Sequence, residues 1–254
     1  MKVKERAKVL SQKKLADGVF SMVLETEASK YAVPGQFINI FSNDGSKLLP
    51  RPTSICEIDK DANTLRVVYR VVGAGTTEFS GLVEGDSVEV LGPLGNGFPL
   101  EGKTAIVVGG GIGVPPMLQL TKEFPGPVTA VMGYRNDDLF LADEFIDASN
   151  ELIVATDDGS VGVHGTVVDA MKENDLTADV IYACGPKPML RGVAEYAKEK
   201  GIKCYVSMEE RMACGVGACL GCVCQSTDVD DHSHVNNKRV CKDGPVFLST
   251  EVVL

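Results

Sequence analysis

Two patterns of apolar and polar residues follow one another along the chain. Up to about residue 99, short alternating runs are separated by turn residues such as Asp44-Gly45. Residues 65–70 have the period of two that indicates a strand with one buried face. Several short strands at this spacing favour a small antiparallel barrel. Strands are expected at residues 19–25, 36–41, 64–71 and 87–91.

The pattern changes after Gly95-Asn96-Gly97-Phe98. From there on, short apolar runs alternate with segments of helical length and spacing, which is typical of a doubly wound α/β domain with a parallel sheet. The expected strands are residues 104–108, 128–132, 152–155, 180–183 and 203–206. The expected helices are residues 115–123, 165–173 and 188–200.

Ligands of doubly wound sheets bind beyond the carboxyl ends of the strands. The loops expected to carry function are therefore residues 109–116, 133–138, 156–162 and 184–188. The last segment of the chain shows no long periodic element and holds most of the cysteines. The chain thus divides into three expected parts: a barrel at 1–99, a doubly wound domain at 100–207 and a cysteine module at 208–254.

Charge and composition exclude several classes of protein. The net charge of the 254 residues is −10, and no basic cluster is longer than Lys13-Lys14, so binding to a polyanion such as DNA is not expected. No stretch approaches the roughly 20 apolar residues that a membrane helix needs. The N-terminal residues lack the apolar core of a signal peptide. We therefore expect a cytoplasmic protein.

The eight cysteines are the most informative part of the composition. Clustered cysteines in a cytosolic protein indicate metal or redox chemistry rather than disulfides. Cys214, Cys219 and Cys222 have four and then two residues between them, and Cys241 follows after 18 more. This spacing matches the plant-type [2Fe–2S] pattern. The glycines of the loop allow its amide N–H groups to point at the sulfur atoms, which stabilises an anionic cluster.

Other interpretations of the cysteine module remain. A structural zinc site usually has two C-x2–4-C pairs, and the second pair is missing here. Cys224 could replace Cys222 as third ligand, although the two-residue spacing favours Cys222. His232 and His234 lack the short spacing to cysteines of a Rieske centre and are interpreted as the tip of a solvated acidic loop. The other three cysteines stand in apolar, strand-like contexts that favour core packing: Cys56, Cys184 and Cys204.

A glycine-rich turn follows the first strand of the predicted doubly wound domain. The segment Gly109-Gly110-Gly111-Ile112-Gly113 precedes Pro115-Pro116, so a pyrophosphate could approach the backbone and the free N–H groups of a helix start. Val114 stands where a third glycine would complete G-x-G-x-x-G, and no acidic residue ends the second strand. Alone, the motif is weak. Cys184-Gly185-Pro186-Lys187-Pro188 adds a second turn at the same expected sheet edge.

Two motifs lie in the predicted barrel, Arg51-Pro52-Thr53-Ser54 and Gly73-Ala74-Gly75-Thr76. An arginine can bind a pyrophosphate through two hydrogen bonds, and a serine can hydrogen-bond a flavin ring nitrogen. Considered alone, the motifs are better explained by a turn at Pro52 and a glycine-rich hairpin.

The order of the motifs resembles one family over essentially the whole chain. The motifs are RPTS, YRVVGAGT, GPLGNGF, GGGIGVPPM, CGPKPML and EERMACGVGACLGCVC. Together they resemble the electron transfer subunits of dihydroorotate dehydrogenase B, which are iron–sulfur flavoproteins of the ferredoxin-reductase type. The resemblance implies an FAD-binding antiparallel barrel, a doubly wound NAD-binding domain and a small C-terminal [2Fe–2S] module.

The resemblance also implies which residues bind each cofactor. FAD would be held by residues of the barrel: Arg51, Pro52, Thr53, Ser54, Val68, Tyr69, Arg70, Gly75 and Thr76. NAD would bind at the two turns of the second domain: Gly109, Gly110, Gly111, Gly113, Cys184, Gly185 and Pro186. The cluster would be ligated by Cys214, Cys219, Cys222 and Cys241. No catalytic residue for an organic substrate is expected in this chain.

The implied partner is a separate FMN-containing catalytic subunit that oxidises dihydroorotate to orotate in pyrimidine biosynthesis, in a heterotetramer of two plus two chains. A flavin is needed between the other two cofactors, because nicotinamide exchanges a hydride and the cluster exchanges single electrons. NAD is expected rather than NADP. Arg135 could bind a 2′-phosphate, but Asp137 and Asp138 would repel it.

Three other functions are compatible with parts of the sequence. The small subunit of an NAD(P)H–ferredoxin or sulfide oxidoreductase would have the same layout. An oxygenase reductase would need about twice the 47 residues that follow Ser207 for its ferredoxin domain. A non-catalytic zinc protein would lack flavin and visible colour. The acidic, histidine-containing insert between Cys222 and Cys241 is a departure from the family pattern.

Overall fold

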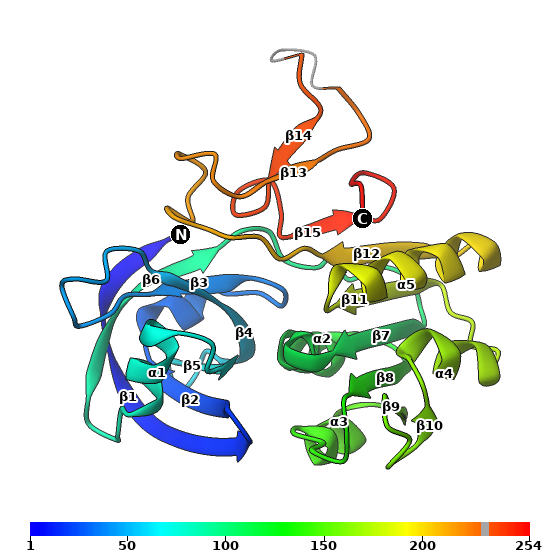
Figure 1. The fold of residues 1–254 in the computed structure, drawn as a ribbon, viewed down its shortest axis with the longest axis horizontal. Coiled ribbons are helices and arrows are strands. Elements are labelled where there is room, and N and C mark those ends of the chain that lie inside the picture. The colour runs from blue at the N-terminus through cyan, green and yellow to red at the C-terminus, as the bar shows by residue number, and fades with distance from the viewer. Residues whose placement is uncertain (230–233) are drawn as a thin grey trace.

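The computed structural model describes residues 1–229 and 234–254. Figure 1 shows a barrel and an α/β sheet domain side by side, with the C-terminal segment lying across the top of both. The predicted fold class, an antiparallel barrel followed by a doubly wound, mostly parallel sheet and a cysteine-rich segment, is confirmed.

Six antiparallel strands close the barrel in the order β1-β2-β5-β4-β3-β6. Their bounds are β1 Val3–Ala16, β2 Val19–Glu25, β3 Phe37–Ile40, β4 Arg51–Asp59, β5 Thr64–Arg70 and β6 Ser87–Leu94. Alternate side chains fill the interior, and these include Met22, Leu65, Val67 and Val90. A 3-10 turn (η1, Glu27–Tyr31) and the short helix α1 (Ala74–Ser80) complete this part.

The second sheet has seven strands in the order β10-β9-β8-β7-β11-β12-β15. The strands are β7 Ala105–Gly110, β8 Val128–Tyr134, β9 Glu151–Thr156, β10 Val163–His164, β11 Val180–Cys184, β12 Lys203–Ser207 and β15 Val246–Leu248. All neighbours are parallel except β15, which runs antiparallel to β12. The order reverses between β7 and β11, which places a switch point at the carboxyl end of β7.

Helices cover both faces of this sheet. Their bounds are α2 Pro115–Glu123, α3 Ala142–Ala148, α4 Val167–Glu173 and α5 Lys187–Lys200, and a short 3-10 turn, η2 (Gly111–Gly113), precedes α2. Residues of α2 and α3 share one apolar core with the outer face of the barrel. Residues of α4 and α5 pack in a second core on the opposite face. α5 ends at Gly201, whose φ of +70° is the left-handed conformation that glycine adopts without strain.

Two further features of the structure bear on the sequence analysis, one in the C-terminal segment and one beside the barrel. Residues 208–254 contain the hairpin β13 (Val223–Gln225) and β14 (Asn237–Arg239), and β15 then joins the large sheet as an edge strand. The cysteine segment is therefore partly continuous with the second domain. The motif Gly73-Ala74-Gly75-Thr76 is the start of α1 and not a hairpin, because the side chain of Thr76 caps the helix by accepting the N–H of Gly73 at 3.1 Å.

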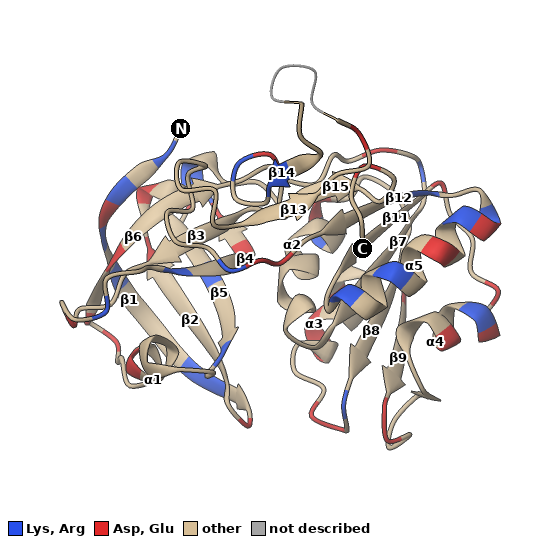
Figure 2. Ribbon diagram, turned by 45° about the horizontal axis from the view of Figure 1, so that its top comes forward, with Lys and Arg blue, Asp and Glu red and all other residues tan. Residues whose placement is uncertain are grey.

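Polar contacts fix the barrel against the second sheet. The Gln119 side chain on α2 accepts the backbone N–H of Ile58 on β4 at 2.8 Å. Arg66 of the barrel donates to Glu57 at 2.6 Å and to Glu144 on α3 at 2.8 Å. Figure 2 shows acidic and basic residues interspersed over both parts, without one extended basic face. The polar contacts between the two parts hold the barrel and the second sheet in a fixed arrangement.

Candidate functional site

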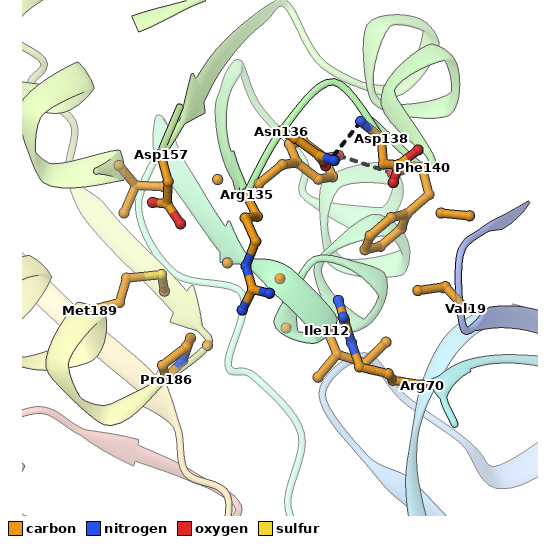
Figure 3. A pocket seen from close by; sticks show the side chains of 18 of the residues that line it. Val19, Arg70, Ile112, Arg135, Asn136, Asp138, Phe140, Asp157, Pro186 and Met189 are labelled. Carbon is orange, nitrogen blue, oxygen red and sulfur yellow. Dashed lines mark hydrogen bonds between the residues drawn. The ribbon is translucent and has the colours of Figure 1, made fainter. Parts of the chain in front are cut away.

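A cavity of about 610 Å³ lies between the barrel and the carboxyl edge of the parallel sheet. The four loops predicted to carry function each contribute to its wall, through residues 110–113, 133–136 with Asp138, Asp157, and 185–186. The barrel contributes the opposite wall, which includes Val19 and Arg70 (Figure 3). The cavity thus occupies the place where doubly wound sheets bind their ligands.

The glycine-rich turn lines this cavity, and two of its positions are glycine for different reasons. Gly111 has φ +54°, a conformation that side chains rarely adopt, and a Cβ there would meet no neighbour, so its backbone is open. A Cβ on Gly113 would lie 2.3 Å from the carbonyl oxygen of Cys184, because the two turns touch. Gly109 lies within β7 and does not line the cavity. Met132 and Val114 leave no room for a Cβ at Gly109.

Charged side chains of both signs project into the cavity. Figure 3 shows the Arg135 guanidinium near its middle, with the carboxylate of Asp157 on one side and Asn136 and Asp138 on the other. The amide oxygen of Asn136 accepts the N–H of Asp138 at 3.3 Å. Asp137, which the sequence argument paired with Asp138, is not among the lining residues. The acids that do line the cavity are Asp17, Asp138, Asp157 and Glu209.

A smaller cavity of about 90 Å³ adjoins the first. β4 contributes Pro52 and Ser54, and the two turns contribute Gly113, Cys184 and Gly185. The rest of the wall includes residues 207–210 with Met212, the segment that leads to Cys214, together with Phe37, Ile112 and Pro245. Gly113, Gly185 and Glu209 line both cavities, so the two cavities are neighbours.

The barrel residues expected to hold a flavin point in different directions. Arg51 lies across Gly75, where a Cβ would be only 2.0 Å from the arginine Nε, and it donates to the carbonyl of Leu49. The Thr76 hydroxyl accepts the N–H of Val72 at 2.9 Å and caps α1. These contacts bring the two barrel motifs, RPTS and GAGT, together.

The motif on β5 divides between two faces. Val68 and Arg70 face outward, Val68 into the core shared with α2 and Arg70 into the large cavity. Tyr69 points into the barrel interior, where Gln12 donates to its hydroxyl at 2.7 Å and it packs on Phe79. The Tyr69 side chain therefore packs inside the barrel. Thr53 donates to the carbonyl of Arg51 at 3.4 Å and lines neither cavity.

The cysteine loop is wrapped so that its amides point at sulfur. Five hydrogen bonds of 3.1–3.4 Å reach the Sγ atoms of the four predicted ligands: Val216 and Ala218 to Cys214, Gly221 to Cys219, Cys241 to Cys222, and Gly217 to Cys241. Amides aimed at sulfur stabilise thiolates and the anionic clusters that thiolates bind. The four side chains therefore fit an iron–sulfur cluster.

The thiols also lie in two pairs, Cys214 beside Cys219 and Cys222 beside Cys241. Burial raises the pKa of Cys214, but amides of the loop, including that of Val216, outweigh burial and lower it to about 6. Burial and the neighbouring Cys222 raise the pKa of Cys241 to about 12. Among the described residues, no group of three or more His, Cys, Asp or Glu side chains is placed to hold one metal ion.

The other cysteines have ordinary packing roles. Cys224 is buried on β13, and burial raises the pKa of its thiol. Cys56 and Cys204 are buried in the cores, as expected, and burial raises the pKa of both thiols. Cys184 is half-buried in the wall of the smaller cavity, and burial raises its pKa to about 12. His234 is exposed, and His232 lies outside the described residues.

Asparagines of the barrel hold the two segments that carry the cysteines. The buried Asn39 on β3 donates to the carbonyl of Cys214 at 3.2 Å. Asn96 donates to the carbonyl of Asp243 at 2.9 Å, two residues after Cys241. Sequence reasoning missed these contacts, and it missed Asp157 and Glu209, because a lone polar residue carries no periodic or spacing signal. The position of Asp157 at the end of a predicted strand was the one available hint.

Comparisons with known proteins agree with this geometry. Residues 209–253 match the family model described as the iron-sulfur cluster binding domain of dihydroorotate dehydrogenase B. The dihydroorotate dehydrogenase B (NAD(+)) electron transfer subunit of Listeria monocytogenes serotype 4a is 44% identical, with 97% of this chain and 98% of that protein covered. The corresponding subunit of Bacillus caldolyticus is 43% identical, with 99% of each covered.

Two solved structures are also similar. One, described as an NADH-dependent reduced ferredoxin-NADP oxidoreductase, has a TM-score of 0.87 and 32% identity, covering 97% of this chain and 89% of that chain. A ferredoxin NADP+ reductase from Neisseria gonorrhoeae with bound FAD and NADP shares the fold, with a TM-score of 0.66 and 18% identity over 82% of this chain and 94% of that chain.

These comparisons agree with the fold and with the cysteine-rich segment. The chain has the fold of ferredoxin reductases, and its residues 209–253 match an iron–sulfur cluster binding domain. No helix within residues 1–229 and 234–254 is long and apolar enough to cross a membrane. The resemblance predicted from the motifs is confirmed, and the chain belongs to the family of electron transfer subunits of dihydroorotate dehydrogenase B.

Proposed function

We propose that this chain transfers electrons from an FMN-containing subunit that oxidises dihydroorotate to NAD+, with a [2Fe–2S] cluster and FAD as its own carriers. The setting is cytoplasmic pyrimidine biosynthesis. The observation that carries the proposal is the smaller cavity, whose walls come from β4, from the two glycine turns and from the segment leading to Cys214. A group held there touches both the nucleotide cavity and the cysteine loop.

The pairing of the thiols supports a binuclear cluster. Each iron of a [2Fe–2S] cluster takes two cysteine ligands, and the four thiols lie as Cys214 with Cys219 and Cys222 with Cys241. We assign these four residues as ligands and leave Cys224 out. The cluster would exchange one electron at a time.

The contact between Arg51 and Gly75 supports an FAD site on the barrel surface. Arg51 would bind the pyrophosphate, with the backbone at Gly75 and Thr76 beside it. Pro52 and Ser54 would face the flavin ring, since both line the smaller cavity. FAD would supply the exchange between a hydride and single electrons.

The large cavity would bind NAD. Gly110, Gly111 and Gly113 would receive the pyrophosphate at the open backbone of the turn. Gly185 and Pro186 would face the nicotinamide half, because they adjoin the smaller cavity. Two acids, Asp138 and Asp157, stand near Arg135 and disfavour the dianionic 2′-phosphate of NADP.

The proposal assigns each part of the chain one cofactor. Residues 1–99 bind FAD, residues 100–207 bind NAD, and residues 208–254 hold the cluster. Cys219 is the one predicted ligand that is exposed, so the cluster is accessible to a partner from its side. The partner is the FMN-containing catalytic subunit, in a complex of two plus two chains.

A small subunit of a ferredoxin-NADP oxidoreductase is the second candidate. The structural match with 32% identity and a TM-score of 0.87 favours it over other reductases. The relatives named as dihydroorotate dehydrogenase B subunits are more similar, at 40% to 45% identity over nearly the full length. The partner separates the two candidates, because the folds are shared.

Purification of the tagged chain from its native cells tests the proposal. We expect a brown protein with one FAD and two irons per chain, and a copurifying FMN protein present in equal amount, in an assembly of the mass of two plus two chains. Copurification of a large ferredoxin-NADP oxidoreductase subunit in place of the FMN protein would establish the second candidate.

A further inference from the structure

Arg239 makes the most extensive set of polar contacts at the cysteine loop, and neither the motifs nor the proposed function uses it. It ends β14, two residues before Cys241. Its Nε and Nη2 donate to the two carboxylate oxygens of Asp243, at 3.0 Å each. The side chain is 30% exposed, so the pair is partly shielded from solvent. This two-point geometry holds the guanidinium plane in one orientation.

The third contact of Arg239 reaches across to the other cysteine segment. Its Nη1 donates to the carbonyl oxygen of Gly217 at 3.2 Å. The same peptide group carries the N–H of Ala218, which donates to the Sγ of Cys214 at 3.3 Å. Arg239 therefore holds one end of a peptide whose other end points at a predicted ligand sulfur.

The conformation of Gly217 makes this arrangement possible. Its φ is +84°, and its own N–H donates to the Sγ of Cys241 at 3.1 Å, the shortest of the five amide–sulfur distances. Both peptide groups of Gly217 thus point N–H at sulfur, one toward Cys241 and one toward Cys214. The Gly217 carbonyl, which Arg239 contacts, lies between these two N–H groups along the chain.

A cation at the carbonyl end of a peptide strengthens the N–H donor at its other end, because hydrogen bonds in a chain polarise one another. The charge of Arg239 also acts directly. Both effects favour additional negative charge at the four sulfurs.

We propose that Arg239 is a positioning residue for the iron–sulfur cluster: it orients and polarises the Gly217–Ala218 peptide and makes the addition of one electron to the cluster more favourable. The inference rests on the ligand set assigned above. One electron enters the cluster, no bond of the protein breaks, and Arg239 keeps its proton throughout, since its pKa is far above neutral pH.

Lys242 provides a matched control on the same turn. Its side chain covers Gly217, where a Cβ would lie 2.6 Å from the lysine Cδ, but Lys242 itself is exposed. It has the same charge as Arg239 and makes no hydrogen bond to the Gly217 carbonyl among the described residues. Lys242→Gln therefore removes a nearby charge without releasing the peptide.

The experiment is a redox titration of the purified full-length protein with its cluster, followed by electron paramagnetic resonance of the reduced cluster. We expect Arg239→Gln to lower the equilibrium constant for one-electron reduction at least tenfold, which corresponds to about 59 mV. We expect less than a threefold change in Lys242→Gln. Arg239→Lys keeps the charge without the two-point contact and should lie between wild type and Arg239→Gln.

Two outcomes would overturn the inference. One is Arg239→Gln with full iron content and a reduction equilibrium within threefold of wild type. The other is a shift in Lys242→Gln as large as that in Arg239→Gln, which would reduce the effect to general charge. If Arg239→Gln loses its iron, Arg239→Lys decides the question. A change of at least threefold in its reduction equilibrium supports the inference, and a smaller change contradicts it. A wild-type protein without an iron–sulfur signal would instead contradict the proposed cofactor.

Discussion

Four cysteine side chains carry the most specific chemistry of this molecule, and a fifth lies close to them without sharing it. Amides point at the sulfurs of Cys214, Cys219, Cys222 and Cys241. Cys224 is buried in the same apolar core as Cys222 and Cys241, so burial does not separate it from the proposed ligands. The spacing of the cysteines is the reason for leaving Cys224 out of the proposed set.

Serine substitutions test this assignment one residue at a time. We expect each of Cys214→Ser, Cys219→Ser, Cys222→Ser and Cys241→Ser to lose iron and visible absorbance, because a cluster needs all four thiolates. Cys224→Ser is the matched control and should keep both. Full iron in Cys222→Ser together with loss in Cys224→Ser would exchange the third ligand.

Arg51 allows a second test at this scale. Arg51→Ala should weaken FAD binding about tenfold to 150-fold, since a charge-assisted hydrogen bond contributes about 1.5–3 kcal/mol. The measurement is FAD release on dilution, followed by flavin fluorescence, with iron content unchanged. Arg6→Ala removes an exposed arginine of β1 that bonds Ser87 and should leave FAD affinity as it is. Equal FAD affinity in Arg51→Ala and Arg6→Ala would show that Arg51 does not bind FAD.

Some residues of the candidate sites could be predicted from the sequence, and others could not. The cysteine spacing is mostly a local signal, because Cys214, Cys219 and Cys222 share one loop, and with Cys241 it predicts the four side chains proposed as ligands. Asn39 and Asp157 could not be found in this way. They reach their sites only through pairing of distant strands and loops, and an isolated Asn or Asp is far more often an ordinary surface or turn residue.

At the scale of elements, the site is built from strand ends. The turn after β7 and the turn after β11 meet, and the loops after β8 and β9 supply the charges of the large cavity. Most strand positions were predictable from apolar runs, because buried parallel strands read as continuous apolar segments. β15 was not predictable, since three residues carry too little pattern and the strand pairs with β12 from a distant part of the chain.

The loops after β8 and β9 decide the nucleotide in this account. We expect the wild-type protein to prefer NADH over NADPH in kcat/KM for reduction of an artificial acceptor. Asp157→Ser should shift this preference toward NADPH about tenfold, or about 1.4 kcal/mol, because it removes repulsion of the 2′-phosphate and leaves Arg135 in place.

Asp137→Ser is the control for this prediction, as Asp137 lies on the same loop as Asp138 and does not line the cavity. It should leave the NADH to NADPH preference within about twofold of wild type. A tenfold preference of the wild type for NADPH would mean that Arg135 dominates and that the acids do not act on the ribose.

At the scale of the whole molecule, one ionic network links the barrel to the helices of the sheet domain. Glu57 of the barrel accepts hydrogen bonds from Arg66 and from Lys122 on α2, and Arg66 also reaches Glu144 on α3. Burial alone would raise the pKa of Glu57, but its bonds to Lys122 and Arg66 outweigh burial and hold the pKa below its usual value of 4.5. The network therefore favours the ionised carboxylate.

Glu57→Gln should lower the free energy of unfolding at pH 7 by about 1–2 kcal/mol, since the pairs are only partly shielded. A carboxyl whose pKa is lowered in the folded state stabilises that state fully at pH values above its unfolded pKa of about 4.5. This contribution is lost as the pH falls through the folded-state pKa. The deficit of the variant should thus shrink below pH 4.5 in urea unfolding followed by circular dichroism. Asp17→Asn, in an exposed pair, is the control, and an equal effect there would contradict the role of Glu57.

The three parts of the chain have one function only if electrons pass through all of them, and reconstitution with a partner measures this directly. The purified chain is mixed with an FMN-containing dihydroorotate dehydrogenase subunit, and NADH formation from dihydroorotate and NAD+ is followed by absorbance. We predict that NADH forms only when both chains are present, and that Cys219→Ser abolishes it while dihydroorotate oxidation with an artificial acceptor continues. NADH formation by the FMN subunit alone, or none with both chains fully loaded with cofactor, would contradict the account.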